Sequence, residues 1–382
     1  MNILYFIADG PNEYNSSRWR VSSPYNAINK RDWKHKARIA SSKIWMDQTD
    51  EAKELCQWAD LISIQRVGID KSIPAIKYWR SRGKAVVIDY DDDYFRINKS
   101  NAAFKFWGEG MVDITVNDGH KFQTPMNTHP VVQFIEGLKS CTAATMPSEL
   151  LARDARAFTD SFFIPNYIEK SLYPVRNKKE LDPNKIVIGW GGSLSHIESF
   201  EHSGVVPALK NILDSRNNVY LLIVGDERVV TKLKELGVRG DRIIYHPYVP
   251  YDRWYQTLQL YDIGIAPLAQ EYDMRRSWIK VVEYMSMGIP FVATDTAPYQ
   301  NQRIRHHCRT GLFVKQGDKA SDSNEHEWER ALLGAITNLK ELKEKAQQDS
   351  DEHYFNFEIE TNVESILKIY QEIVDIEKGE LL

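Results

Sequence analysis

The stretch MRRSWIKVVEYMSMGIPFVATD, residues 274–295, contains a basic loop, a short helical pattern, a break and an apolar strand. The Ser277 hydroxyl can cap the first turn of a helix, and Gly288 with Pro290 is a usual C-terminal stop. We therefore predict a helix of about three turns that leads into a buried strand. A helix followed at once by a buried strand is typical of α/β folds.

The two sides of this predicted helix differ in character. At about 100° per residue, one side is an apolar stripe that we expect to pack on a sheet. The stripe consists of Trp278, Val281, Val282 and Met285. The other side carries Arg276, Lys280 and Glu283, a pattern that favours a phosphate on the cations and vicinal hydroxyls, such as those of ribose, on the carboxylate. A solvated basic surface with an i,i+3 ion pair is the alternative interpretation.

Length and composition set the broad class of the protein. A chain of 382 residues predicts two domains, and a formal charge of -4 argues against general binding to nucleic acid. The three cysteines, Cys56, Cys141 and Cys308, are too far apart for a disulfide scaffold or a CxxC metal site. The opening apolar run is too short for a signal peptide or a membrane span. We expect a cytoplasmic protein, with peripheral membrane contact still compatible.

Toward the N-terminus, strand and helix patterns alternate. Apolar runs at residues 2–8, 61–64 and 85–88 are separated by amphipathic stretches at 51–58 and 73–80. This alternation predicts βαβ units and a parallel, doubly wound sheet. Ligands bind at the carboxyl ends of the strands in such sheets, so the residues that follow each run are candidates for a site.

One of these strand ends is acidic. Asp89, Asp91, Asp92 and Asp93 place four carboxylates in five residues. Their repulsion must be relieved by solvent, cations or hydrogen-bond donors. Such a cluster favours binding of acceptor hydroxyls, action as a base or a divalent metal, and a solvated turn that caps the next helix is the alternative. Beyond it the pattern weakens, and we expect a flexible loop or insertion from residue 104 to 129.

The second half of the chain repeats the βα rhythm. Residues 165–167 and the polar stretch 176–184 are predicted as an interdomain linker, and a strand at 185–188 leads into the turn GWGGSLSH, residues 189–196. Glycines after a strand let backbone amides approach a diphosphate, although this turn is neither a Walker A loop nor a GxGxxG motif. Further strands are predicted at 219–224, 243–245, 261–268 and 291–294, and closing helices at 325–346 and 358–376.

Histidine and acidic residues near the glycine turn do not predict a metal site. His196 and His202 lie six residues apart, on different faces of a helix. His306, His307 and Cys308 are poorly spaced for one tetrahedral ion, and we interpret them as surface residues.

Taken in order, five motifs resemble the retaining GT-B glycosyltransferases of the family 4 type (glycosyl transferases group 1). They are IPNYI as the hinge, IGWGGSLSH, LLIVGD, YDIGIAPL and KVVEYMSMGIPFVATD, and the resemblance is strongest from residue 164 to 294. It implies an α/β GT-B fold with two Rossmann-like domains that face a central cleft. Residues 1–165 would form the acceptor domain, 166–352 the nucleotide-sugar domain, and 353–382 a helix that crosses back to the first. No metal or other cofactor would be required, and a UDP-sugar is favoured over a GDP-sugar as the donor.

The resemblance also assigns residues, with two departures. Glu283 matches the second acid of the E-x7-E signature of the family and would bind the donor ribose. The first acid would fall at position 275, where this chain has Arg275, and the loop after the GGS turn lacks the usual Arg and Lys. We therefore expect Arg276 and Lys280, together with Arg275, to neutralise the donor phosphates and stabilise the leaving nucleoside diphosphate.

The remaining site predictions divide between donor and acceptor. Asp92 joins Lys280 and Arg276 as a catalytic candidate. Further donor-binding candidates are Gly191, Gly192, Ser193, His196, Asp226, Tyr248 and Ser277. The acceptor or cleft candidates are Gly10, Arg18, Arg20, Asp91 and Asp93. For Arg18 and Arg20 the two interpretations are contact with a donor phosphate or anionic acceptor, and a surface position.

The sequence thus predicts a hexosyl- or pentosyltransferase that moves a sugar from a nucleotide-sugar to a hydroxyl acceptor. Retention would rest on same-face attack, with the leaving phosphate accepting the acceptor proton. A glycan is the expected acceptor, in polysaccharide or glycan assembly, and a modified nucleic-acid base is the alternative acceptor. A different alternative is a catalytically weakened nucleotide-sugar-binding subunit, which the missing first acid motivates.

Overall fold

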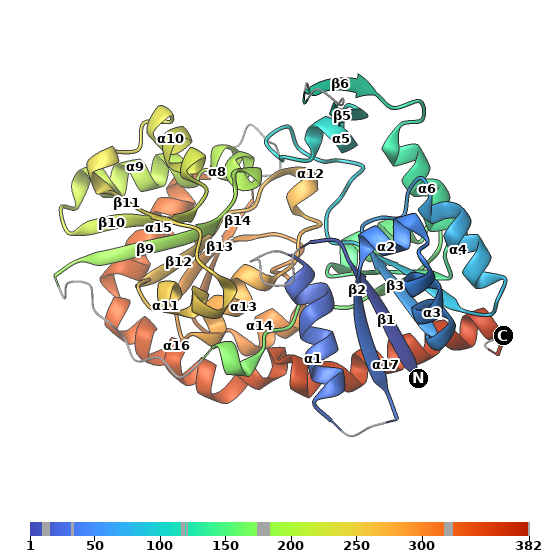
Figure 1. Cartoon of the computed structure of the whole chain (residues 1–382). Coiled ribbons are helices and arrows are strands. Elements are labelled where there is room, and N and C mark those ends of the chain that lie inside the picture. The colour runs from blue at the N-terminus through green and yellow to red at the C-terminus, as the bar shows by residue number, and fades with distance from the viewer. Residues whose placement is uncertain are drawn as a thin grey trace. The chain divides into compact units, whose positions relative to one another are not determined.

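A parallel β-sheet forms the centre of each of two units in this chain (Figure 1). The computed structural model describes residues 1–9, 16–31, 34–115, 119, 121–173, 184–316 and 324–380. The first unit contains Met1–Lys99, Ala103–Tyr167 and Ile359–Leu382, and the second contains Ser100–Ala102 and Ile168–Glu358. Two parallel α/β units confirm the predicted fold class.

The first sheet has the strand order β2-β1-β3-β4-β7-β8, and all of its pairs are parallel. Its central strands are continuous apolar runs because helices cover both faces. In sheet order the strands are β2 (Lys36–Ser41), β1 (Asn2–Ile7), β3 (Leu61–Gln65), β4 (Ala85–Asp89), β7 (Ala143–Met146) and β8 (Asp160–Phe163). The register pairs Gln65 with Asp89 and Asp89 with Thr145, so these three polar residues lie side by side at the carboxyl edge.

Helices from both ends of the chain cover this sheet. The C-terminal helix α17 (Ile359–Lys378) packs its buried apolar side on the same core as β1, and its Tyr370 hydroxyl lies 3.2 Å from that of Tyr5. Figure 1 shows α17 beside α1 (Ser23–Asn29). The other helices of the unit are the π-helical turn η1 (Arg18–Ser22), α2 (Ser42–Asp47), α3 (Asp50–Trp58), α4 (Ser72–Arg80), α5 (Phe104–Trp107), α6 (Pro130–Ser140) and α7 (Glu149–Ala155).

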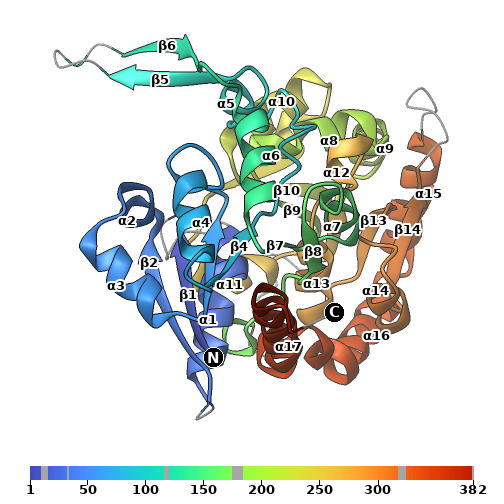
Figure 2. The same ribbon diagram turned by 90° about the vertical axis from the view of Figure 1, so that its right-hand side faces the viewer.

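The stretch from residue 104 to 129, which we expected to be a flexible loop or an insertion, contains regular structure. After α5 the strands β5 (Met111–Thr115) and β6 (Lys121–Pro125) pair in antiparallel register. Figure 2 shows this hairpin projecting from its unit. β-branched residues occur beside polar ones along β5, a composition typical of strands. The flexible-loop interpretation was wrong because neighbouring glycines obscured this composition, whereas the hairpin does not contradict an insertion.

The second sheet has the strand order β11-β10-β9-β12-β13-β14, again wholly parallel. In sheet order the strands are β11 (Ile243–Pro247), β10 (Val219–Gly225), β9 (Ile186–Gly192), β12 (Ile263–Ala266), β13 (Phe291–Asp295) and β14 (Gly311–Lys315). The strand predicted at residues 185–188 therefore continues to Gly192. Gly192 pairs with Gly225 in register, so two glycines meet at the carboxyl edge.

Nine α-helices lie within the described residues of the second unit. They are α8 (Ile197–His202), α9 (Val205–Ser215), α10 (Glu227–Glu235), α11 (Trp254–Leu258), α12 (Gln270–Asp273), α13 (Ile279–Ser286), α14 (Gln302–His307), α15 (Glu325–Thr337) and α16 (Leu339–His353). Short 3-10 turns are η2 (Lys170–Leu172), η3 (Leu194–His196), η4 (Gly240–Arg242), η5 (Tyr251–Arg253) and η6 (Tyr354–Phe357). Along the part of the chain that the structure describes, no helix has the length and apolar character needed to cross a membrane.

The helix predicted in residues 274–295 is α13, and it is shorter than expected. It has 8 residues, and its N-cap position is Trp278 rather than Ser277. The Ser277 hydroxyl accepts from the Ile279 amide at a long 3.5 Å, so the predicted cap was wrong. The predicted stop is confirmed, because Gly288 has a φ of +59° and the Ile289 amide bonds to the Tyr284 carbonyl at 2.9 Å. The apolar stripe is buried as predicted.

Candidate functional site

The glycine turn at the end of β9 brings backbone from two strands unusually close. A Cβ atom on Gly225 would stand 2.4 Å from the Gly192 carbonyl oxygen, and its φ is +114°. A Cβ on Gly191 would stand 2.3 Å from the Trp254 ring. Only glycine fits these positions, and the bare backbone that results lies where ligands bind in parallel sheets.

Arg276 connects three segments at this edge. Its Nε donates to Asp273 Oδ1 at 2.8 Å, its Nη2 donates to the Ser195 carbonyl at 2.9 Å, and its Nη1 lies 3.1 Å from His196 Nε2. The guanidinium also lies over the Tyr272 ring, 4.7 Å from the centroid. Arg276 therefore holds the loop before α13 against the turn after β9.

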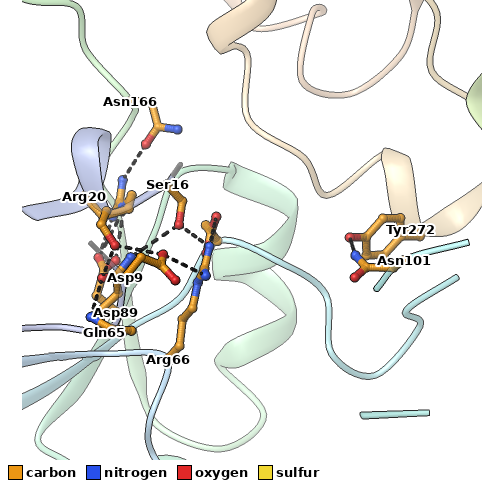
Figure 3. A network of polar contacts seen from close by, with 12 residues as sticks. Asp9, Ser16, Arg20, Gln65, Arg66, Asp89, Asn101, Asn166 and Tyr272 are labelled. Atoms are coloured by element: carbon orange, nitrogen blue, oxygen red, sulfur yellow. Dashed lines mark hydrogen bonds and ion pairs between the residues drawn. The ribbon is translucent and has the colours of Figure 1, made fainter. Parts of the chain in front are cut away.

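Asp273 is a site residue that sequence reasoning missed. Its side chain accepts from the Ser199 hydroxyl at 2.6 Å and the Ala269 amide at 2.9 Å, in addition to Arg276. It is buried and lies three residues before Arg276, so their i,i+3 spacing was the available signal. Its neighbour Tyr272 accepts from Asn101 Nδ2 at 2.9 Å, a bond within the second unit that Figure 3 also draws.

His196 is a neutral hydrogen-bond donor in this cluster. Burial, Arg276 and Lys280 all lower the pKa of its imidazole well below the usual value. Because Arg276 can only donate, His196 Nε2 accepts and Nδ1 carries the proton. This Nδ1 is buried and has no hydrogen-bond partner among the described residues. A buried donor left unpaired costs about 1–3 kcal/mol, so His196 is ready to bind an acceptor such as a phosphate oxygen.

Lys280 supplies the positive charge closest to the glycine turn. Its Nζ donates to the Gly191 carbonyl and lies 4.8 Å from the centroid of the Trp190 ring. Burial lowers the pKa of this ammonium group to about 8, Glu283 opposes the shift and Arg276 adds to it. Lys280 is therefore charged at neutral pH but poorly compensated, and a bound anion would stabilise it.

Glu283, one turn beyond Lys280, is buried with 1% of its surface exposed. Its Oε1 accepts from the Tyr173 hydroxyl at 2.7 Å. The alternative of a solvated basic surface was therefore wrong, since this side of α13 faces the protein and the Arg276 side chain is only 14% exposed. Tyr173 lies 110 residues away in sequence, and no local pattern could have predicted the contact.

Arg275 does not join the cluster. Its Nη1 donates to the carbonyl and to the Oε2 of Glu271, at 2.7 Å and 2.8 Å. The side chain is 6% exposed and belongs to the turn of α12. The basic residue at the position of the first acid is thus engaged by an acid of its own segment.

The other donor candidates surround the glycine turn. The Ser193 and Ser195 hydroxyls lie 2.8 Å apart. Asp226 caps α10 by accepting from the Arg228 amide at 3.1 Å and accepts from the Leu194 amide at 3.3 Å, so it joins the turns after β9 and β10. Tyr248 is 55% exposed and lies against Gly225.

In the first unit, Arg20 forms a buried ion pair rather than a surface contact. Its Nη2 and Nε donate to the Asp89 carboxylate at 2.6 Å and 3.0 Å, and its Nη1 donates to Asn166 Oδ1 at 3.1 Å and to the Ile164 carbonyl (Figure 3). Thr145 Oγ1 also donates to Asp89, at 2.7 Å. The surface interpretation of Arg20 was therefore wrong.

Arg66, which sequence reasoning missed, bridges two carboxylates at the same edge. It donates to Asp91 at 2.9 Å and 3.1 Å and to Asp9 at 3.0 Å, and also contacts the Ser16 hydroxyl (Figure 3). Burial raises the pKa of Asp91, but Arg66 more than compensates and holds it below the usual value. Arg66 has a φ of +64°, which costs free energy in a large residue and is found at functional sites.

The acidic cluster is thus divided among separate arginines. Asp93 accepts from the Phe95 amide at 3.1 Å and from Arg96 Nη1 at 3.0 Å. Its role in the turn matches the capping interpretation more than an open ligand site. Among the described residues, no group of His, Cys, Asp and Glu is arranged to hold a metal ion. Asp92 and Arg18 are half-buried, and Gly10 lies outside the described residues.

One protein-family model matches a large part of the second unit. Residues 185–337 match the family model of the glycosyl transferases group 1. The match includes the glycine turn, α13 and every donor-side candidate. No curated protein sequence matches the chain.

Solved structures share the fold across the whole chain. Sucrose-phosphate synthase from Thermosynechococcus elongatus aligns with a TM-score of 0.61 and 12% identity, over 97% of this chain and 98% of the other. The catalytic domain of starch synthase IV from Arabidopsis thaliana, bound to ADP and acarbose, aligns with a TM-score of 0.61 and 9% identity, over 98% and 99%. HepE from Anabaena, in complex with UDP and glucose, aligns with a TM-score of 0.59 and 14% identity, over 97% and 100%.

These similarities confirm the predicted GT-B fold. At this identity they establish the architecture alone. Together with the match of residues 185–337, they support a GT-B glycosyltransferase.

Proposed function

We propose that this protein transfers a hexosyl or pentosyl group from a nucleotide-sugar to a hydroxyl acceptor, with retention of configuration. One observation carries the proposal. Lys280, Arg276 and His196 gather at the glycine turn of β9, and the buried Glu283 lies one turn further along the same helix. This arrangement lies within the segment that matches the glycosyl transferases group 1.

The donor diphosphate would bind at the glycine turn. Lys280 provides a buried cation that donates to the Gly191 carbonyl, and burial lowers its pKa to about 8 although Glu283 opposes the shift. His196 provides a buried N–H without a partner among the described residues. Arg276 already donates to Asp273, His196 and Ser195, so we assign it to positioning His196 as well as to the local positive charge. Both cations would stabilise the leaving nucleoside diphosphate, where negative charge develops.

The nucleoside would extend from the diphosphate toward Glu283. A buried carboxylate accepts strongly from hydroxyl groups, and the vicinal hydroxyls of ribose fit this chemistry. We propose a UDP-sugar as donor, with a GDP-sugar as the alternative, and no requirement for a metal. The complexes of the structural neighbours contain UDP with glucose in one case and ADP with acarbose in another.

The acceptor would meet the carboxyl edge of the first sheet. Asp9, Arg66 and Asp91 form a polar network there that remains partly exposed, with side-chain exposures of 26%, 27% and 16%. Carboxylates and guanidinium groups bind sugar hydroxyls, which favours a glycan. Asp92 is the proposed catalytic carboxylate of this edge, and the leaving phosphate would accept the proton of the acceptor hydroxyl.

A second candidate function is a nucleotide-sugar-binding subunit with weakened catalysis. The observation that favours it is Arg275, which stands at the position of the first acid and is paired with Glu271. The two functions differ in one product. An enzyme releases nucleoside diphosphate from its donor, whereas a binder shows affinity without release.

A screen of UDP-, GDP- and ADP-sugars for release of nucleoside diphosphate tests the proposal. We expect release from one donor class, and we expect Lys280→Met to lower the rate at saturating donor by about 100-fold or more. Lys232→Met is the matched control, because Lys232 lies on the same unit and pairs with Glu235 on the surface. An unchanged rate for Lys280→Met at saturating donor would contradict the assignment, and binding without release would favour the second candidate.

A further inference from the structure

Tyr173 and Glu283 form a buried contact that the proposed chemistry does not require. The Tyr173 hydroxyl donates to Glu283 Oε1 at 2.7 Å. Tyr173 is 7% exposed and Glu283 is 1% exposed, so both polar groups are removed from water. Tyr173 follows η2, far from α13 in sequence, so the contact is specific to the folded second unit.

The phenol makes the same kind of bond that a sugar hydroxyl would make. Both are neutral O–H groups that donate to a carboxylate, and both give a short, charge-assisted hydrogen bond. A carboxylate with 1% exposure offers no surface to a second molecule. Any nucleotide hydroxyl that binds the Glu283 carboxylate must therefore first displace a group that covers it. The Tyr173 hydroxyl, which is bonded to Glu283 Oε1, is such a group.

We propose that the Tyr173 hydroxyl occupies the position on Glu283 that a ribose hydroxyl takes, and that the nucleotide displaces it on binding. This inference rests on the proposed function, in which Glu283 binds ribose. Tyr173 gives the buried carboxylate a charge-assisted hydrogen bond while the site is empty, and this bond offsets part of the cost of burying the charge. The same bond lowers nucleotide affinity, because binding exchanges one hydrogen bond for another.

A neighbouring tyrosine provides the matched control. Tyr284 follows Glu283 on α13 and is equally buried, but its hydroxyl donates to the Ile265 carbonyl at 3.0 Å. Tyr284→Phe therefore removes a buried tyrosine hydrogen bond close to the site without freeing Glu283. Any general effect of losing a buried hydroxyl is measured by this variant.

The first experiment compares nucleotide affinities by calorimetry, with UDP as the probe, or ADP if UDP does not bind. We expect Tyr173→Phe to bind the nucleotide about threefold to tenfold more tightly than the wild type, the value of one hydrogen bond. We expect Tyr284→Phe to match the wild type. Equal or weaker binding by Tyr173→Phe would overturn the inference, since Tyr173 would then orient Glu283 rather than compete for it.

Two further measurements distinguish a failure of this inference from a failure of the proposed function. The wild type should bind 2′,3′-dideoxy-UDP more weakly than UDP. Equal binding would instead refute the ribose role of Glu283, which belongs to the proposed function. In the wild type with 3-fluorotyrosine at position 173, the fluorine resonance should shift with UDP and not with inorganic pyrophosphate, which has no ribose. A resonance that UDP leaves unmoved would overturn the displacement without relying on any variant.

Discussion

Two buried cations, Arg20 in the first unit and Lys280 in the second, are held in opposite ways. Arg20 meets the Asp89 carboxylate through two nitrogens, and although burial lowers its pKa, Asp89 raises it above the usual value. Lys280 donates to the Gly191 carbonyl rather than to a carboxylate, and burial lowers its pKa to about 8. Similar burial thus has opposite outcomes because only one cation has a bonded counter-ion.

The difference indicates a structural role for Arg20 and a ligand-binding role for Lys280. A compensated pair such as Arg20 and Asp89 joins elements of the first unit and has no need of a ligand. A buried cation without a bonded counter-ion raises the free energy of the empty site. A bound anion relieves this cost, and the relief contributes to the affinity for the anion. We infer that the first unit uses its buried charges for architecture and the second uses them for the donor phosphates.

The largest expected effect comes from breaking the compensated pair. Arg20→Met should lower the free energy of unfolding by about 3–5 kcal/mol, because it leaves the buried Asp89 carboxylate without its counter-ion. Urea denaturation measures the loss. The double variant Arg20→Met with Asp89→Leu should recover most of this stability. A single Arg20→Met variant as stable as the wild type would contradict the structural role of Arg20.

The protonation of Lys280 should make the free energy of unfolding depend on pH. Because its folded pKa of about 8 lies below the usual 10.5, the folded state releases the proton first as pH rises. The free energy of unfolding should therefore increase between these two values, and Lys280→Met should lack this increase. The difference between the two proteins in denaturant titrations at several pH values checks it. Parallel curves would mean that burial does not perturb Lys280.

Asp226 should show a smaller effect on stability. Asp226→Ala removes the N-cap of α10 and the bond to the Leu194 amide, and should cost about 1 kcal/mol. Asp226→Asn keeps a capping oxygen and should lose less. Thermal unfolding measures both variants, and a greater loss in the Asn variant would argue that the charge of Asp226, rather than its cap, matters.

The smallest expected effect is that of metal removal. The carboxylates of the first sheet edge are committed to Arg20, Arg66 and Arg96, which leaves them poorly disposed to bind a divalent ion. Donor turnover should therefore be the same with and without EDTA. Complete loss of turnover, restored by magnesium or manganese, would revive the metal interpretation of the acidic cluster.

Local patterns account for what the sequence predicted correctly. The stop at Gly288, the apolar stripe of α13 and the alternation of strands and helices depend on residues a few positions apart. The spacing of Arg276 and Lys280 placed both on one side of a helix, and the structure brings both to the glycine turn. The parallel α/β class followed from the same short-range signals, whereas the GT-B fold was implied by the resemblance of the motifs to a family.

Long-range pairing accounts for what the sequence did not reveal. Arg66 meets Asp9 and Asp91 because the parallel register aligns the ends of separate strands, and this register is not readable from either strand alone. Tyr173 meets Glu283 across 110 residues. The helix start also shifted from Ser277, because the bonds of Arg276 to Asp273 hold the preceding segment in the turn of α12.

The charge state of Lys280 during donor binding tests the central claim most directly. Calorimetry of UDP binding at about pH 8.5, in buffers of different ionisation enthalpy, measures the protons taken up. The phosphates raise the pKa of Lys280 if they bind beside it, so the wild type should take up a substantial fraction of one proton and Lys280→Met should take up none. Equal proton uptake by the two proteins, or none in either, would contradict a donor phosphate site at Lys280.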